Sequence, residues 1–167
     1  MMKLELGCGN RPTEGYLHQD VIQLETPLDY CCAAWNIPLY EGSLDEVIAI
    51  AVMEHLRFAE FRQTLKHIHR LLKPGGVFYF DVPDLKVWSY YLFLLLDHRA
   101  EENSELVPYS LEDVMKTMWG WQRWDGDEHK SMWTKESLLS ELREFKVSDG
   151  FEDIKKRVQR DRFSHPE

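Results

Sequence analysis

Short apolar runs, each followed by glycine or polar residues, recur along the first half of the chain. The first run covers 4–6 and passes directly into a Gly-x-Gly turn, and similar runs cover 43–51 and 77–82. Continuous apolar runs of this length are typical of parallel strands buried between two layers. An amphipathic stretch, 58–72, separates the last two runs, and a Lys-Pro-Gly-Gly turn ends it. The pattern predicts an α/β domain in which strands alternate with at least one helix.

The first turn favours a nucleotide-type ligand. Gly7 and Gly9 lack the Cβ atoms that would keep a ligand away from the backbone. Asp20 ends the next predicted strand, where a carboxylate can accept hydrogen bonds from ribose hydroxyls, and a solvated turn residue is the alternative. The gap between Gly9 and Asp20 is too short for a crossover helix, so we expect a loop. Arg11 and Pro12 occupy the region where a dinucleotide fingerprint has its third glycine. Their presence argues against a nicotinamide-dependent oxidoreductase.

The segment 84–150 is rich in aromatic residues and contains five of the chain's six tryptophans. We expect helices over 110–118, with a capping box at its start, and over 135–145. The apolar run 85–96 is shorter than the roughly 20 residues that a membrane-spanning helix needs, so it predicts a buried helix or a dimer contact. The tryptophans either cradle a ring or sugar or pack this segment onto the sheet. A sixth strand is expected over 151–154.

Composition indicates one soluble domain over 1–167, with 44% hydrophobic residues and no linker. The formal net charge of −9 argues against a broad nucleic-acid-binding face, because such faces need clustered lysine and arginine. The three cysteines have no metal-ligand spacing, and the acidic turn 125–128 lacks the distal Glu of a calcium loop. No signal peptide precedes the first strand. We therefore expect a cytoplasmic protein with no membrane span and no metal site.

Taken in chain order, these segments resemble the class I S-adenosylmethionine-dependent methyltransferases, and in particular a small branch of that family. The matching segments are 5–12, 15–20, 37–39 with 44–47, 53–56 and 71–76. The resemblance implies a Rossmann-like, doubly wound, mostly parallel sheet with an aromatic-rich helical insertion before the last strand. It divides the domain into a cofactor-binding half (1–83), a helical cap or substrate segment (84–150) and a terminal strand and tail (151–167).

For the cofactor, the resemblance implies S-adenosylmethionine held against the backbone of the Gly7-Cys8-Gly9 turn. Asp20 would hold the ribose hydroxyls, and Glu5 would either lie near the ammonium group or have a structural role. The acidic residue that commonly holds the adenine amino group is replaced by the stretch 32–34, so Trp35 either stacks on the base or fills core volume. The implied cofactor-binding residues are Glu5, Gly7, Cys8, Gly9, Asn10, Asp20, Val21, Trp35 and Ala51.

Two histidines are candidates for catalysis. His55 follows Glu54 beyond the fourth strand, where a neutral imidazole can take a proton from a hydroxyl or amine, and a helix-start or packing role is the alternative. His129 lies in a His-Lys-Ser segment that resembles the same branch, near the expected pocket mouth, and it either contacts the substrate or fixes the start of the following helix. His67 and His69, on the predicted helix before the Lys-Pro-Gly-Gly turn, look like surface residues.

These observations favour an S-adenosylmethionine-dependent methyltransferase that acts on a small-molecule or glycan-type acceptor. Methyl transfer asks little acid–base chemistry of a protein, since aligning the reactants alone can lower a barrier by about 7–11 kcal/mol. The alternative is a catalytically inactive, methyltransferase-like module that binds a cofactor or a partner, which the missing third-strand acidic residue supports. A homodimer would cover sheet or helix surface left exposed by the short ends.

Overall fold

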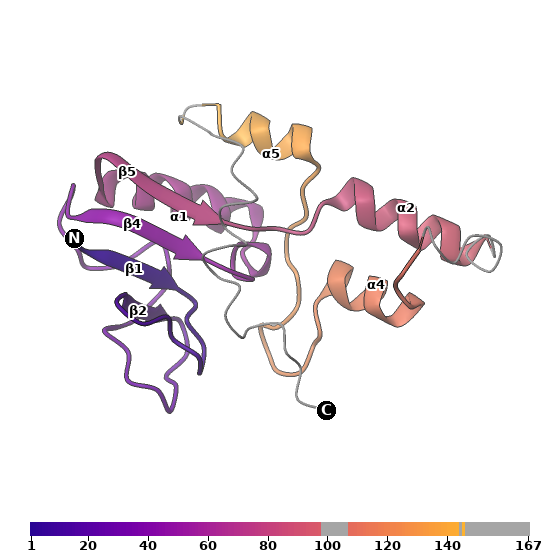
Figure 1. Cartoon of the computed structure of the whole chain (residues 1–167), viewed down its shortest axis with the longest axis horizontal. Helices are drawn as coiled ribbons and strands as arrows, with labels where there is room; N and C mark the ends of the chain where they lie inside the picture. The colour runs from indigo at the N-terminus through magenta and orange to yellow at the C-terminus, as the bar shows by residue number, and fades with distance from the viewer. Residues whose placement is uncertain (98–106, 144, 146–167) are drawn as a thin grey trace.

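The computed structural model describes residues 1–97, 107–143 and 145, and it contains one parallel sheet of five strands (Figure 1). The strands are β1 (Lys3–Leu6), β2 (Leu17–Asp20), β3 (Tyr30–Cys31), β4 (Leu44–Ala49) and β5 (Leu72–Phe80). Their order across the sheet is β3-β2-β1-β4-β5, and every neighbouring pair is parallel. The chain thus winds outward from β1 in both directions, which confirms the predicted doubly wound α/β class.

One face of the sheet is covered by α1 (Phe58–Leu71), whose bounds match the predicted helix (Figure 1). Leu4 and Leu6 alternate with Glu5 along β1, so both leucines point toward this helix. The shared core contains the fully buried Leu4, Leu6, Val47, Ala49, Phe61, Ile68 and Leu71. This packing holds β1 and β4 side by side, and their carboxyl ends therefore meet at one edge of the sheet.

The strand after α1 starts earlier than the sequence predicts. Leu72 already pairs with Leu44, whereas Val77 pairs with Glu46, so residues 73–76 form an irregular bulge between two paired stretches. Pro74 has no backbone N–H to give to the ladder, and Gly75 has a φ of +82°, which explains why the bulge falls there. The expected turn is present, but it lies inside the strand.

Among the described residues, three helices follow the sheet: α2 (Leu85–Leu96), α4 (Leu111–Trp119) and α5 (Lys135–Glu141). In Figure 1, α2 and α4 lie beyond the arrowheads of the strands, at the carboxyl edge of the sheet. Ser110 and Asp113 form the predicted capping box of α4. The expected helix over 135–145 ends at Glu141, because the chain turns there and brings Leu142 and Phe145 onto the core.

The helix α2 is far less buried than the sequence predicts. Leu94 is its one buried residue, and its exposed apolar side chains are Val87, Tyr90, Phe93 and Leu96. A dimer contact at this helix stays a prediction. Among the described residues no helix is both long and apolar enough to span a membrane. The predicted sixth strand lies outside the described residues.

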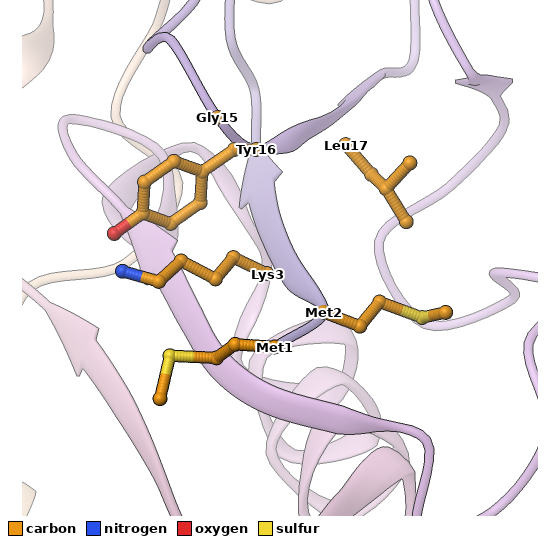
Figure 2. A pocket seen from close by; sticks show the side chains of 6 residues that line it. All are labelled: Met1, Met2, Lys3, Gly15, Tyr16 and Leu17. Atoms are coloured by element: carbon orange, nitrogen blue, oxygen red, sulfur yellow. The ribbon is translucent and has the colours of Figure 1, made fainter.

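A shallow hollow of about 420 Å³ opens at the amino ends of β1 and β2 (Figure 2). Its lining is Met1, Met2, Lys3, Gly15, Tyr16 and Leu17. Glu46 accepts a hydrogen bond from the Tyr16 hydroxyl and lies 3.4 Å from Lys3 Nζ. This hollow is at the opposite end of β1 from the Gly7 turn, whereas ligands of open α/β sheets bind at the carboxyl ends of the strands.

Candidate functional site

The loop after β1 is anchored to the end of β2 by three successive backbone donors. Gly7 N donates to Gln19 Oε1 (3.3 Å), Cys8 N donates to the Gln19 carbonyl (3.1 Å), and Gly9 N donates to Asp20 Oδ2 (3.1 Å). Both glycines have positive φ, +56° and +57°, which explains the residue type at each position. No helix forms between Gly9 and Asp20, as predicted.

The two glycines differ in what surrounds them. A Cβ on Gly7 would lie 2.5 Å from Val52 Cγ2, so the protein itself closes this position. A Cβ on Gly9 would meet no atom of the described residues within 4 Å, so the backbone there is open as far as these residues are concerned. Because Val52 follows β4, its packing on Gly7 joins the first loop to the loop after β4.

The tip of β2 combines a carboxylate with uncovered apolar side chains. Asp20 Oδ1 accepts a hydrogen bond from Ile22 N over 3.1 Å. The Val21 side chain is 65% exposed and that of Ile22 is 48% exposed. Together with the backbone at Gly9, these residues form a surface that combines a carboxylate with exposed apolar side chains.

Glu5 lies behind the loop and is fully buried. Its carboxylate accepts hydrogen bonds from Thr13 N (2.7 Å) and Thr13 Oγ1 (2.9 Å), which hold the loop back against β1. Glu5 therefore has a structural role. Its predicted approach to an ammonium group stays a prediction. Cys8 is buried, whereas Asn10 is exposed on the same loop.

Trp35 follows the third strand, in the segment that leads from β3 back to the core. β3 ends at Cys31, and the Cys32 carbonyl accepts a hydrogen bond from Gln19 Nε2, the side chain that also holds Gly7. Trp35 is half-buried beside the core residue Ala34. Whether it stacks on a base stays a prediction.

Ala51 adopts a conformation that is rare for a residue with a side chain. Its φ is +53°, and its backbone N–H donates to Asp81 Oδ1 over 2.8 Å. A left-handed alanine costs roughly 1–2 kcal/mol, and such strain is concentrated at functional sites. The hydrogen bond ties the segment after β4 to the segment after β5 at the same edge of the sheet.

Glu54 and His55, two and three residues after Val52, come together with His129 from a distant part of the chain. Glu54 and His55 belong to the short 3-10 helix η1 (Met53–His55), and His129 comes from the segment between α4 and α5. The ring centroids of the two histidines are 4.9 Å apart, and His129 Nε2 lies 4.0 Å from Glu54 Oε1. His55 Nδ1 lies 3.2 Å from the Glu128 carbonyl oxygen.

Burial shifts the pKa of each of these three groups in the direction that favours its neutral form. It raises the pKa of the Glu54 carboxyl to about 8, and the negative charge of Asp81 adds to the effect. Burial lowers the pKa of His129 to about 4, and the charge of His55 acts in the same direction. The pKa of His55 is also lowered by burial, against the opposing hydrogen bond to the Glu128 carbonyl. At neutral pH the group therefore holds a protonated carboxyl and two neutral imidazoles.

Main-chain hydrogen bonds fix His129 in this position. His129 N donates to the Trp119 carbonyl over 3.1 Å. The Glu54 carbonyl accepts from Lys130 N (2.8 Å) and Ser131 N (3.1 Å). The His129 side chain is only 9% exposed, so it lies within the cluster instead of at an open pocket mouth. Glu54 as a third member was missed in the sequence, because its contact with His129 joins segments that are distant along the chain.

Four of the five tryptophans of 84–150 divide into two groups, and the fifth, Trp88, is half-buried against Tyr109. Trp133 is buried and packs on Phe58 and Phe61 of α1, with ring centroids 4.9 and 4.8 Å apart, so it holds this segment on the core. Trp119, Trp121 and Trp124 are each more than two-fifths exposed. The packing interpretation is therefore right for Trp133, and a substrate role of the exposed three stays a prediction.

Comparison with known proteins identifies the family. The model of a family described as "Methyltransferase domain" matches residues 3–152. The chain therefore belongs to this family of methyltransferase domains, as the order of its motifs indicates. A nicotinamide-dependent oxidoreductase is thereby set aside.

Individual relatives share limited sequence identity with this chain or match only part of it. The mouse (Mus musculus) tRNA (carboxymethyluridine(34)-5-O)-methyltransferase ALKBH8 is 33% identical over 87 residues, a match that covers 43% of this chain and 13% of that protein. A SAM-dependent methyltransferase from Methanosarcina mazei has a TM-score of 0.51 at 14% identity, covering 86% of this chain and 77% of that one. One from Thermotoga maritima has a TM-score of 0.48 at 16% identity, covering 86% and 62%. The chain thus spans only part of these relatives.

Proposed function

We propose that this chain holds S-adenosylmethionine over the Gly7-Cys8-Gly9 turn and methylates a small-molecule or glycan-type acceptor beside His55 and His129. The observation that carries the proposal is the packing of Val52 on Gly7. This contact places the first loop within one helical turn of Glu54 and His55. A ligand over the first loop and an acceptor beside the histidines would therefore be neighbours.

The cofactor supplies a methyl group on a sulfonium, which is already a good leaving group. The protein itself binds the cofactor and the acceptor and orients them. Asp20 would accept hydrogen bonds from the ribose hydroxyls with the lone pairs that Gly9 N and Ile22 N leave free. The uncovered Val21 side chain would pack against adenine, with Trp35 on its other side. Asn10 and Ala51 would line the ribose and methionine portions, and Glu5 would act through the loop that it holds.

His55 is suited to take a proton from the acceptor. Its Nδ1 is engaged by the Glu128 carbonyl, which leaves Nε2 as the basic nitrogen of a neutral imidazole. His129 packs edge-on against the same ring and limits its rotation. An acceptor hydroxyl or amine at Nε2 would therefore meet a fixed, desolvated base.

The charge balance favours a small acceptor over a nucleic acid. The net charge is −9, and no broad cluster of cations follows from the sequence. The mouse relative is named for a tRNA substrate, yet this chain covers 13% of it, so RNA methylation is an outcome for the substrate screen to exclude. A cytoplasmic location stays a prediction.

Isothermal titration of the purified chain with S-adenosylmethionine and S-adenosylhomocysteine tests the proposal, with Asp20→Ala as the comparison. Micromolar binding that the variant loses supports the cofactor site. A screen of small hydroxyl, amine, glycan and RNA acceptors with a labelled methyl donor then tests turnover, and His55→Ala should abolish it. Absence of binding to either ligand would make the inactive module the better description.

A further inference from the structure

We propose that Glu54, His55 and His129 form a binding site for one divalent transition-metal ion of the zinc class. Each residue offers one ligand atom, and these atoms lie within 4.8 Å of one another. Two imidazoles and one carboxylate are a ligand set that proteins use for Zn²⁺ and for Fe²⁺. Sequence spacing gives no sign of this site, because the ligands come from η1 and from the distant segment after α4.

An unsatisfied polar atom inside the cluster points to a missing cation. Glu54 is 5% exposed, and its Oε2 is buried without a hydrogen-bond partner among the described residues. His129 Nδ1 is also buried, and the Thr117 backbone is the hydrogen-bonding group that acts on this imidazole. Within the described part of the chain, the Glu54 carboxylate has no lysine or arginine partner. In the metal-free protein this carboxyl is neutral; a divalent cation would displace its proton and bind the oxygen that the described residues leave without a partner.

The surroundings orient the ligands as metal sites require. His55 Nδ1 faces the Glu128 carbonyl at 3.2 Å, which leaves Nε2 as the nitrogen available to bind a metal. A hydrogen bond of this kind on the non-ligating nitrogen is a regular feature of metal-bound histidines. Lys130 N and Ser131 N both donate to the Glu54 carbonyl, so the two ligand-bearing segments are fixed to each other by main-chain bonds.

The three ligand atoms must move closer together to bind one zinc ion. Ligands bound tetrahedrally to zinc at about 2.0–2.1 Å lie roughly 3.3 Å apart, whereas Glu54 Oε1 and His129 Nε2 are 4.0 Å apart and the three ligand atoms are within 4.8 Å of one another. Small rotations of the three side chains close this difference. Three protein ligands leave a further coordination position for water or for an acceptor oxygen. Zinc takes up the lone pair of His55 Nε2, so the proton-accepting role proposed above belongs to the metal-free state.

Zinc titration of the apo protein tests the site without cofactor or acceptor, so its result is independent of the proposed methyl transfer. The experiment uses a Cys31→Ser/Cys32→Ser background, because both thiols are accessible zinc ligands. We expect one zinc per chain. The variants His55→Gln and His129→Gln, chosen to preserve volume, should weaken binding by about 100-fold or more. His69→Ala, which removes an exposed histidine on α1, should bind as the parent does.

Thermal melting separates loss of the site from loss of the fold. Zinc should raise the melting temperature of the parent and of His69→Ala, and it should leave that of His129→Gln unchanged while the variant still melts cooperatively. Equal zinc affinity in the parent and in a folded His55→Gln/His129→Gln double variant would overturn the proposal. So would a folded parent that binds no stoichiometric zinc. Failure to bind S-adenosylmethionine would count against the proposed function alone.

Discussion

The backbone N–H of Gly9 donates a hydrogen bond to the carboxylate of Asp20, with 3.1 Å between N and Oδ2. The contact joins the loop after β1 to the last residue of β2 across the sheet edge. One carboxylate therefore both orders the loop and stands at the tip of the strand, where a ribose is expected.

Asp20→Ala should weaken S-adenosylmethionine binding by about 10- to 100-fold, since hydrogen bonds to a charged group are worth roughly 1.5–3 kcal/mol. The fold should survive, because the side chain is at the surface edge of the sheet. Titration calorimetry with a melting curve measures both effects. Asp29→Ala is the matched control, because it removes another surface carboxylate that accepts a backbone N–H, that of His18. Wild-type affinity in Asp20→Ala would remove this carboxylate from the site.

Gly9→Ala separates ligand binding from stability. Among the residues that the structure describes, none has an atom within 4 Å of the added methyl, so the expected cost to folding is that of the left-handed backbone, about 1–2 kcal/mol. If the cofactor lies over this position, the same methyl should reduce its affinity far more than the small drop in melting temperature implies. A variant that binds the cofactor normally would show that Gly9 faces only solvent.

Gly7→Ala should instead damage the protein itself, because its Cβ would lie 2.5 Å from Val52 Cγ2. We expect a larger fall in melting temperature than for Gly9→Ala, since both variants share the backbone strain and only this one adds a collision. The double variant Gly7→Ala/Val52→Ala should recover the difference. No recovery in the double variant would mean that Val52 is not the obstacle.

Local sequence signals predicted the parts of the fold that depend on near neighbours. The turn glycines Gly7 and Gly9, the strand ending at Asp20 and the Ser110 cap all follow from residues close together in the chain. Contacts between segments that are distant along the chain could not be predicted from such local signals. His67 looks like a surface residue in the sequence, yet its Nε2 lies 3.0 Å from Ile37 N and 3.2 Å from Ile37 O. The meeting of Glu54 with His129 is a second case.

Acid should weaken the docking of α5 on α1. Arg62 donates two hydrogen bonds of 2.6 Å to the Glu141 carboxylate, and this pairing holds the pKa of Glu141 below its usual 4.5. A lowered folded-state pKa means that the stabilisation is full above pH 4.5 and is lost as the pH falls through the folded value. The effect should be small and salt-sensitive, because the pair is near the surface.

Melting temperatures of the parent and of Glu141→Gln, measured from pH 7 to pH 3 at low salt, check this pairing. The two curves should converge as the pH falls. Arg62→Gln should give the same curve as Glu141→Gln, since each removes the same pair. A constant difference between parent and variant over the whole range would show that the ion pair contributes no pH dependence.

Gly120→Ala should displace His129, and it should do so more than the nearby substitution Gly126→Ala. Gly120 has a φ of +83°, and an added Cβ would fall on the Asp127 carbonyl oxygen and lie 2.9 Å from His129 N. These atoms are backbone and cannot swing aside, so the turn that brings His129 to Glu54 must open. We expect a clear loss of stability, and turnover should fall with it. Gly126→Ala, also at positive φ but with open space around its Cβ, carries only the backbone strain. Equal melting temperatures for the two variants would mean that the turn adapts to the extra methyl, and His129 would then be held mainly by the Lys130 and Ser131 hydrogen bonds to Glu54.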